Sequence, residues 1–273
     1  MPELQILIAA YGEDALEKIA GLLHASRPGV EYLVGWQRHD RNRIPASLAQ
    51  RADFRIEFED SEGLCNNRNS LLQKATAPFC VIADDDLEYT ETHLEAVLEG
   101  FHENQDCHFL TFRYSSPHFP KDYPAESFDM AKPPKGYFVT SMELAFNLRK
   151  LREDFPNAGP ALFNPAFGIN GDWFCCGEED ILVSRLLGLG CKGRFIPKEI
   201  CLNTDSTTSE RISLTKPYIE TKGAVMAYVR HRSWPLRMIA HALRTREIPL
   251  TRYCRWWLAG VRKARRHKVF DNY

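Results

Sequence analysis

The sequence predicts an α/β fold with a predominantly parallel open sheet flanked by helices, followed by a basic helical extension. Two observations lead to this prediction. Short apolar runs alternate with amphipathic segments through the first hundred residues, as strands and helices alternate in parallel α/β domains. Beyond about residue 206 the pattern is helical only. We therefore expect a main domain over residues 1–205 and a helical extension over 206–273.

The composition is that of one globular enzyme-sized domain with an extension. The chain has 273 residues, of which 44% are hydrophobic and 26% charged, so disorder is not expected. No apolar run reaches the roughly 18 residues that span a membrane, and the N-terminus lacks the features of a signal peptide. The eight cysteines include no C-x-x-C pair, which indicates a reducing compartment. These features predict a cytoplasmic protein.

The predicted elements place several loops at one edge of the sheet. Apolar runs typical of strands cover residues 4–10, 32–36, 54–58, 79–83 and 109–114, with a short one near 195–196. Helical periodicity covers residues 13–25, 66–75, 90–101 and 179–189, and Thr90 is the expected N-terminal cap of the third of these helices. The segment 115–136 carries five prolines and predicts a long loop. Ligands of such sheets bind beyond the carboxyl ends of the strands, so we expect the site there.

Three aspartates follow directly after the strand at residues 79–83. Asp84, Asp85 and Asp86 would repel one another at the sheet edge unless a cation offsets their charge. Mg²⁺ and Mn²⁺ prefer such oxygen ligands and often bind through one or two carboxylates together with substrate phosphates. The alternative is a solvated acidic turn that caps the next helix. The buried strand before the triplet favours the metal site.

Two further segments carry candidate chemistry. In the first, Arg68 follows Gly63 at the start of a helix, where it could meet a diphosphate. A glycine turn with a surface arginine is an equally simple interpretation. In the second, Glu178, Glu179 and Asp180 begin a helix, where acidic residues are favoured by the helix dipole. A carboxylate at that place could also accept the proton of an attacking hydroxyl.

Taken together, these motifs resemble family two glycosyltransferases of the GT-A fold. The resemblance rests on Tyr-Gly-Glu after the first strand, Gly-Leu-x-x-x-Arg-Asn before a helix, a strand ending in Asp-Asp-Asp, and Gly-Glu-Glu-Asp with an arginine seven residues after Glu178. The stretch Phe167–Gly171 leading into Gly177, followed by Gly190 and Phe195-Ile196-Pro197, is similar to members from bacterial surface-polysaccharide pathways. The resemblance covers residues 3–205 approximately.

The resemblance implies a metal-dependent, inverting hexosyltransferase that uses a nucleotide-sugar donor, with a UDP-sugar favoured, and Mn²⁺ or Mg²⁺ as cofactor. The implied acceptor is a glycan or a lipid-linked saccharide. The implied catalytic base is Glu179, or Asp180 if the register differs by one. The other implied roles are nucleotide binding by Tyr11, Glu13, Gln37, Arg68, Asp84 and Asp85, and metal binding by Asp84 and Asp86.

The chain departs from the family pattern at two places. Gln37 stands where many members carry an acidic residue for the base or ribose, and we expect it to substitute by hydrogen bonding. Many members also have a histidine after the strand near residue 200, and this chain has none there. Asp205 could replace that histidine, or the metal could rely on the aspartates alone.

The C-terminal segment has a distinct charge and pattern. Residues 230–273 hold 12 Lys and Arg against 2 Asp and Glu, whereas the rest of the chain holds 23 against 34. Leu236, Ile239, Ala240 and Leu243 share one helical face, and Trp256-Trp257 precede a basic cluster. Basic amphipathic helices of this kind are typical of contacts with anionic membrane surfaces. We expect peripheral contact with the inner face of the cell membrane, with internal packing, protein docking and a nucleic-acid patch as alternatives. Nucleic acid is the least expected of these.

Two other functions remain to be compared with the glycosyltransferase. A sugar nucleotidyltransferase also gathers aspartates on a metal, but its glycine-rich phosphate loop should follow the first strand, where this chain has only Gly12. A catalytically inactive GT-A-like binding or scaffold module would not need both acidic clusters. A turnover measurement separates an active enzyme from such a module.

Overall fold

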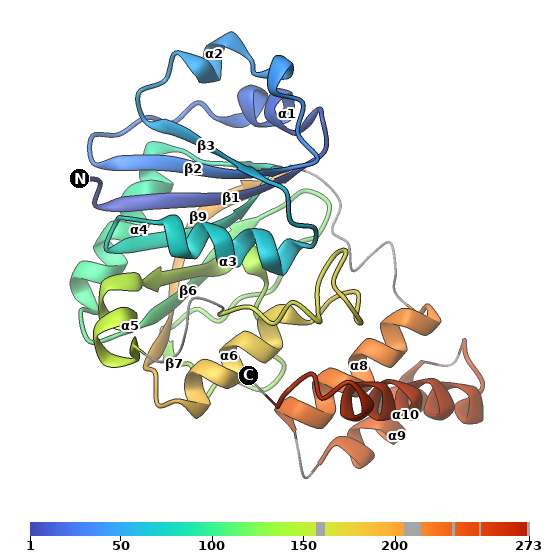
Figure 1. Cartoon of the computed structure of the whole chain (residues 1–273). Coiled ribbons are helices and arrows are strands. Elements are labelled where there is room, and N and C mark those ends of the chain that lie inside the picture. The colour runs from blue at the N-terminus through green and yellow to red at the C-terminus, as the bar shows by residue number, and fades with distance from the viewer. Residues whose placement is uncertain (157–161, 205–213, 231–232, 246, 272–273) are drawn as a thin grey trace. The chain divides into compact units, whose positions relative to one another are not determined.

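The computed structural model describes the 273-residue chain at residues 1–156, 162–204, 214–230, 233–245 and 247–271. The chain divides into two compact units (Figure 1). The first consists of residues 1–62, 66–162 and 186–206. The second consists of residues 63–65, 163–185 and 207–273, so the polypeptide passes between the units several times.

In the described part of the first unit, nine strands form one sheet with the order β3-β2-β1-β4-β8-β6-β9-β5, and β7 pairs with β9. The strands are β1 Leu4–Tyr11, β2 Val30–Gln37, β3 Phe54–Glu59, β4 Phe79–Asp84, β5 Leu87–Glu88, β6 Phe109–Ser115, β7 Phe128–Asp129, β8 Leu144–Asn147 and β9 Gly193–Asn203. The helices of this unit are α1 Ala15–Leu22, α2 Ala46–Ala49, α3 Leu64–Lys74, α4 Glu91–Glu103 and α5 Leu148–Asp154, with the 3-10 helices η1 Arg41–Arg43 and η2 Ser141–Glu143. The first two residues of α3 belong to the second unit.

The sheet begins parallel and becomes mixed. Strands β3, β2, β1 and β4 all run parallel. The short strand β8 then lies antiparallel between β4 and β6, and β6 pairs in parallel with β9. Strands β5 and β7 run antiparallel to β9. The predicted α/β class with a sheet flanked by helices is confirmed, and the antiparallel strand β8 is an element that the sequence did not predict.

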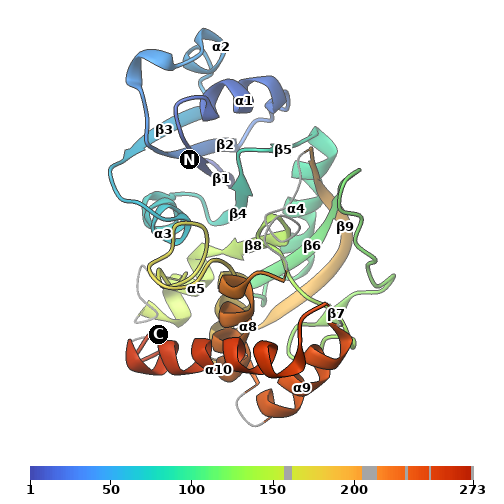
Figure 2. The same cartoon turned by 90° about the vertical axis from the view of Figure 1, so that its right-hand side faces the viewer.

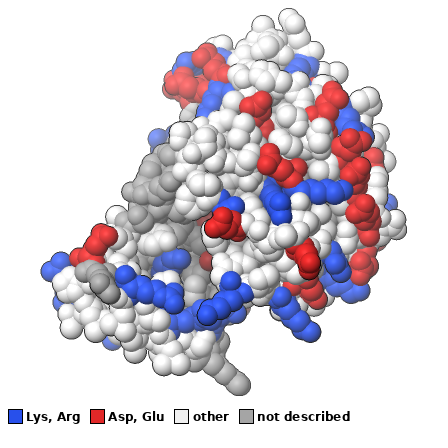
Figure 3. All heavy atoms as spheres, turned by 180° about the vertical axis from the view of Figure 1, so that it is seen from behind, with Lys and Arg blue, Asp and Glu red and all other residues white. Residues whose placement is uncertain are grey.

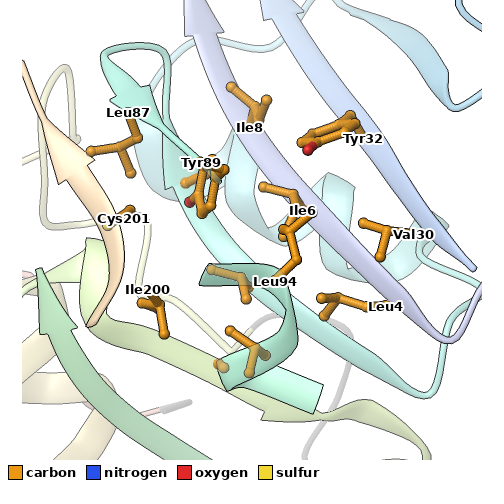
Figure 4. Packing of buried hydrophobic residues seen from close by; sticks show 14 of the residues in the cluster. Leu4, Ile6, Ile8, Val30, Tyr32, Leu87, Tyr89, Leu94, Ile200 and Cys201 are labelled. Carbon is orange, nitrogen blue, oxygen red and sulfur yellow. The ribbon is translucent and has the colours of Figure 1, made fainter. Parts of the chain in front are cut away.

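One face of the sheet carries the main hydrophobic core. Alternate residues of β1, beginning with Leu4, Ile6 and Ile8, point to this face and pack with Leu16 of α1 and Leu94 of α4 (Figure 4). All five side chains are nearly or fully buried. Helix α4 begins at the predicted cap, because the Thr90 hydroxyl accepts a hydrogen bond from the backbone N–H of His93. Burial of these apolar side chains is the main force that holds α1 and α4 on the sheet.

Helix α3 covers the opposite face. The Gln5 side chain, on the face opposite to Ile6, accepts hydrogen bonds from the backbone N–H groups of Thr76 and Ala77 just after α3. The Asn67 side chain donates to the carbonyl oxygen of Gly35 at 2.7 Å. A Cβ atom added to Gly35 would lie 2.0 Å from Asn67 Oδ1, so only glycine allows this approach. The contact fixes the position of α3 along β2 and therefore the place of Arg68.

The second unit is formed by helices and a long loop. It contains most of α6 (Glu178–Gly188), together with α8 Lys216–Val229, α9 Trp234–Arg244 and α10 Leu250–Arg266. Figure 2 shows α10 passing beside α8 and α9. A buried cluster joins Phe167 and Phe174 of the loop and Ile181 of α6 to Ala224 and Val225 of α8, with Ala264 of α10. The loop before α6 therefore shares its core with the C-terminal helices.

Burial separates the two tryptophans of α10 from its basic residues. Trp257 is fully buried in a cluster with Ile219 and Tyr253, and Trp256 is half-buried against the same cluster. Trp257 therefore serves packing within the unit and is not available as a membrane anchor. The eight cysteines are present as thiols. Among the described residues, no helix combines the length and hydropathy needed to cross a bilayer.

Helices α8 and α10 approach so closely that their backbones nearly touch. A Cβ atom added to Gly260 would lie 1.8 Å from the Glu220 carbonyl oxygen, and one added to Gly223 would lie 2.2 Å from that of Trp257.

We expect Gly260→Ala to destabilise the protein by about 1–3 kcal/mol through overpacking, which thermal unfolding will measure. Gly21→Ala in α1 is the control, because nothing lies within 4 Å of its added Cβ and alanine favours helix. Equal melting temperatures for Gly260→Ala and the parent would contradict the close approach.

Candidate functional site

The carboxyl ends of β1, β2 and β4 meet at one edge of the sheet, here named the carboxyl edge. In the parallel register, Tyr11 pairs with Gln37 and Ala9 pairs with Asp84. The backbone N–H of Gly12 also donates to the Gln37 carbonyl oxygen at 2.9 Å. The loops predicted to carry the site therefore leave the sheet beside one another.

Asp84, the last residue of β4, is held at the carboxyl edge through both carboxylate oxygens. The Arg68 guanidinium, which is 1% exposed, lies 2.7 Å from Asp84 Oδ1. The Ser141 hydroxyl donates to Asp84 Oδ2 at 3.2 Å. Arg68 is therefore a buried cation beside the acidic triplet and offsets part of its charge.

Asp85 has a different environment from Asp84. Its carboxylate lies 3.3 Å from the Lys18 ammonium of α1. Burial raises the pKa of Asp85, an effect that Lys18 opposes and the neighbouring Asp84 charge reinforces. The Asp85 carboxylate thus forms an ion pair with α1. Its role in nucleotide binding remains a prediction.

The end of β9 lies beside Asp86. Residues Leu87 and Glu88 pair with Asn203 and Leu202, and the Thr204 hydroxyl donates to the Asp86 carbonyl oxygen at 3.0 Å. This is the place where many family two members carry the additional histidine named above. The next residue, Asp205, which the sequence suggested as its replacement, lies outside the described residues.

Three predicted nucleotide-binding residues lie at or just after the ends of β1 and β2. Tyr11 is 43% exposed, and the Arg38 guanidinium lies 5.5 Å from its ring centroid. Glu13 is exposed and lies 3.2 Å from Arg43. Gln37 is buried, and its side-chain amide donates to the Ser61 carbonyl oxygen at 2.6 Å. An exposed tyrosine ring here can stack on a nucleobase, whereas Gln37 is already engaged by the protein.

The candidate bases begin helix α6 in the second unit. Glu178 is buried, and Glu179 and Asp180 are half-buried. Burial raises the pKa of Asp180, and the positive charges of Lys222 and Arg230 oppose this effect. A carboxylate with a raised pKa is better suited to accept a proton near neutral pH than an ordinary aspartate. Asp180 and Glu179 therefore both remain candidate bases.

The donor set fits a divalent cation that shares its coordination with a substrate. No group of three or more His, Cys, Asp or Glu side chains is arranged to hold a metal ion within the described ranges. Asp84 and Asp86 nevertheless present hard oxygen ligands at one edge. Mg²⁺ and Mn²⁺ often take only one or two protein carboxylates and complete their shell with phosphate and water oxygens. Two aspartates thus suffice chemically for such an ion.

Several residues of the site were not predicted from the sequence. They are Lys18 beside Asp85, Ser141 beside Asp84, Thr204 beside Asp86, and Lys222 and Arg230 beside Asp180. Each is a common residue type without a motif of its own. Only the folded chain brings them to their partners.

Comparison with known proteins shows which class this chain resembles. Residues 42–160 match the family model described as glycosyl transferase family 2, a range that includes Arg68 and the acidic triplet. No curated protein matches the chain in a sequence comparison.

Among solved structures, residues 1–349 of Staphylococcus aureus TarS in complex with UDP-GlcNAc match with a TM-score of 0.66 and 13% identity, over 100% of this chain and 89% of that one. The mannosyltransferase PcManGT from Pyrobaculum calidifontis in complex with GDP-Man and Mn²⁺ matches with a TM-score of 0.52 and 12% identity, over 97% of this chain and 75% of that one. The fold is therefore GT-A-like, and the resemblance to family two glycosyltransferases is confirmed.

Proposed function

We propose that the protein is an inverting, metal-dependent glycosyltransferase that moves a sugar from a nucleotide-sugar donor to a glycan or lipid-linked saccharide. The observation that carries this proposal is the carboxyl edge, where the buried Arg68 lies against Asp84 within the acidic triplet. The same edge carries the exposed ring of Tyr11, a surface on which a nucleobase can stack. Structural neighbours bind UDP-GlcNAc, UDP and GDP-Man, which supports a nucleotide-sugar donor, and a UDP-sugar is the donor to test first.

The chemistry is a single displacement. Asp180 or Glu179 accepts the proton of the acceptor hydroxyl, whose oxygen bonds to the anomeric carbon as the bond from that carbon to the diphosphate oxygen breaks. Attack opposite the leaving group inverts the configuration at the anomeric carbon. Arg68 and Asp84 fix the donor at the sheet edge. A Mn²⁺ or Mg²⁺ ion held by Asp84 and Asp86 would supply positive charge against the leaving diphosphate.

The resemblance to surface-polysaccharide enzymes suggests a bacterial glycan or a lipid-linked precursor of one. A lipid-linked acceptor would bring the protein to the inner face of the cell membrane, where its C-terminal helices would meet anionic lipid.

The donor site is tested by calorimetric titration of UDP in the presence of Mn²⁺, in EDTA, and with Asp86→Ala. We expect binding that depends on the metal and that weakens in Asp86→Ala by at least the roughly 10–100-fold that outer-shell partners of metal ligands cost. Asp106→Ala is the matched control, because Asp106 is an exposed aspartate whose carboxylate lies 3.0 Å from the surface ammonium of Lys192. The control should bind UDP as the parent does.

Absence of heat with UDP would lead to the same titration with GDP, CDP and dTDP. If none of the four nucleotides gives heat of binding, the result would contradict the proposed donor site and favour a scaffold protein. If a nucleotide binds, turnover is then measured with the corresponding nucleotide-sugars.

A further inference from the structure

Helix α9 carries apolar side chains on two of its sides. Trp234, Met238 and Ala242 face the cluster that includes Tyr253 and Trp257 of α10. Leu236, Ile239 and Leu243 lie on the other side of the helix and are 73%, 46% and 62% exposed. The helix therefore has two apolar stripes, of which one is used for packing within the unit and the other faces solvent.

The exposed stripe of α9 stands out from the rest of the surface. Single exposed apolar side chains are normal in globular proteins, but contiguous ones indicate a binding surface. Leu236, Ile239 and Leu243 follow the three- and four-residue spacing that places them in one row. Leu250, at the start of α10, is a further exposed leucine nearby in the chain and is 45% exposed. Such a row in water costs free energy unless a partner covers it.

Helix α9 and the adjoining helix α10 are strongly basic. Helices α9 and α10 contain no Asp or Glu. Arg237 and Arg244 are exposed on α9, and α10 adds the exposed Arg252, Arg255, Arg262, Arg265 and Arg266. Figure 3, which views one side of the molecule, shows Lys and Arg gathered over the C-terminal helices, with few acidic side chains among them. A partner for this surface must therefore offer negative charge as well as an apolar interior.

We propose that the exposed face of α9, defined by Leu236, Ile239 and Leu243, docks into the surface of an anionic lipid bilayer. The three apolar side chains enter the acyl boundary while Arg237 and Arg244 lie at the headgroups, as amphipathic interfacial helices do. Phosphate headgroups supply the negative charge and the acyl chains the apolar phase. Nucleic acid would satisfy the arginines but would leave the apolar row exposed. Trp256 and Trp257 take no part, because they pack within the unit.

Docking would bring the enzyme to a lipid-linked acceptor in the same membrane, a role that rests on the proposed function. The docking itself depends only on the face of α9. Membrane binding and nucleotide binding are therefore measured separately, so that one proposal can fail without the other.

The test is flotation of the full chain with vesicles of phosphatidylcholine alone and with added phosphatidylglycerol. We expect flotation with the anionic vesicles, weakened by high salt. The triple variant Leu236→Asn, Ile239→Asn and Leu243→Asn should lose at least about 100-fold in partitioning, because three apolar side chains no longer enter the bilayer. The control is Leu189→Asn, which alters an exposed leucine outside these helices and should float as the parent does.

Circular dichroism and UDP titration show whether the triple variant is folded. A folded triple variant that floats as the parent does would overturn the docking face, and so would a parent that stays soluble with anionic vesicles. Flotation that depends on α9 in a protein that binds no nucleotide would support the docking face and contradict the donor site. Loss of flotation with unchanged UDP binding is the expected result.

Discussion

Replacing Asp180 with Asn should lower kcat by about 10²–10⁴-fold, the range that a positioned general base contributes, while UDP binding stays unchanged. Asp180 lies at the start of α6, where burial raises its pKa and Lys222 and Arg230 oppose the shift. Glu179→Gln is measured in parallel, since it is the other candidate base. A large loss in Glu179→Gln together with normal turnover in Asp180→Asn would assign the base to Glu179.

The pH profile gives a second measurement of the same group. A base must be deprotonated to act, so kcat should fall on the acid side as Asp180 takes up its proton. Because the pKa of Asp180 is raised, this fall should occur at higher pH than for an ordinary aspartate. Lys222 lowers the pKa of Asp180, so Lys222→Met should move the acid limb to still higher pH.

Lys216→Met is the matched control for this shift. Lys216 lies on the same helix, is exposed and pairs with Glu220. Its replacement should leave the acid limb in place. If the acid side of the kcat profile moves in neither lysine variant, or moves equally in both, Asp180 is not the titrating base.

The second large effect is expected at a buried ion pair in the loop after β6. The Lys121 ammonium and the Glu143 carboxylate are in contact, and their side chains are 3% and 0% exposed. The hydroxyls of Tyr123 and Thr140 also donate to Glu143 Oε1, at 2.7 and 3.1 Å. Burial raises the pKa of Glu143 and lowers that of Lys121, although each charge stabilises the other. The pair fastens the long loop to η2, which also contributes Ser141 to the carboxyl edge.

Lys121→Met should destabilise the protein by about 3–5 kcal/mol, because it leaves the Glu143 carboxylate buried without its cation. The double variant Lys121→Met and Glu143→Gln should recover much of this loss. The deficit of Lys121→Met should also shrink as the pH falls, since the folded state then takes up a proton on Glu143 more readily than the unfolded state. Urea unfolding at two pH values measures both effects.

An exposed ion pair provides the comparison. Lys192→Met removes the surface pair with Asp106 and should change the stability by no more than about 1 kcal/mol. A loss of similar size in Lys121→Met and Lys192→Met would contradict the importance of the buried pair. A double variant no more stable than Lys121→Met would show that the hydrogen bonds of Glu143, rather than its charge, hold the loop.

The first half of the fold was readable from the sequence because buried parallel strands appear as continuous apolar runs. Strands β1 and β4 were predicted within one residue, and Thr90 was recognised as the cap of α4. Strand β8 was missed because only three apolar residues, Leu144 to Phe146, stand between Glu143 and Asn147, a run too short to predict a strand. Strand β9 is 11 residues long but was predicted only near Phe195, because Pro197, Lys198 and Glu199 interrupt its apolar pattern.

Only those residues of the candidate site that belong to a short, recognisable sequence motif could be predicted from the sequence. Asp84 and Arg68 belong to short patterns, and the structure brings these two residues together. Ser141 and Lys18 lie 57 and 67 residues from the aspartates that they contact, so no local pattern connects them. Their place follows from the packing of η2 and α1 against the sheet, which a single sequence does not reveal.

The loop before α6 has a consequence for how this chain can be divided in the laboratory. Phe167, Phe174 and Ile181 find their apolar partners on α8 and α10 rather than within a separate tail. A gene shortened after residue 205 would remove those partners and leave three large apolar side chains exposed, immediately beside the candidate bases. The C-terminal helices therefore cannot be deleted without exposing this core. A chimaeric protein that takes its C-terminal helices from a relative must also take residues 163–185 from that relative.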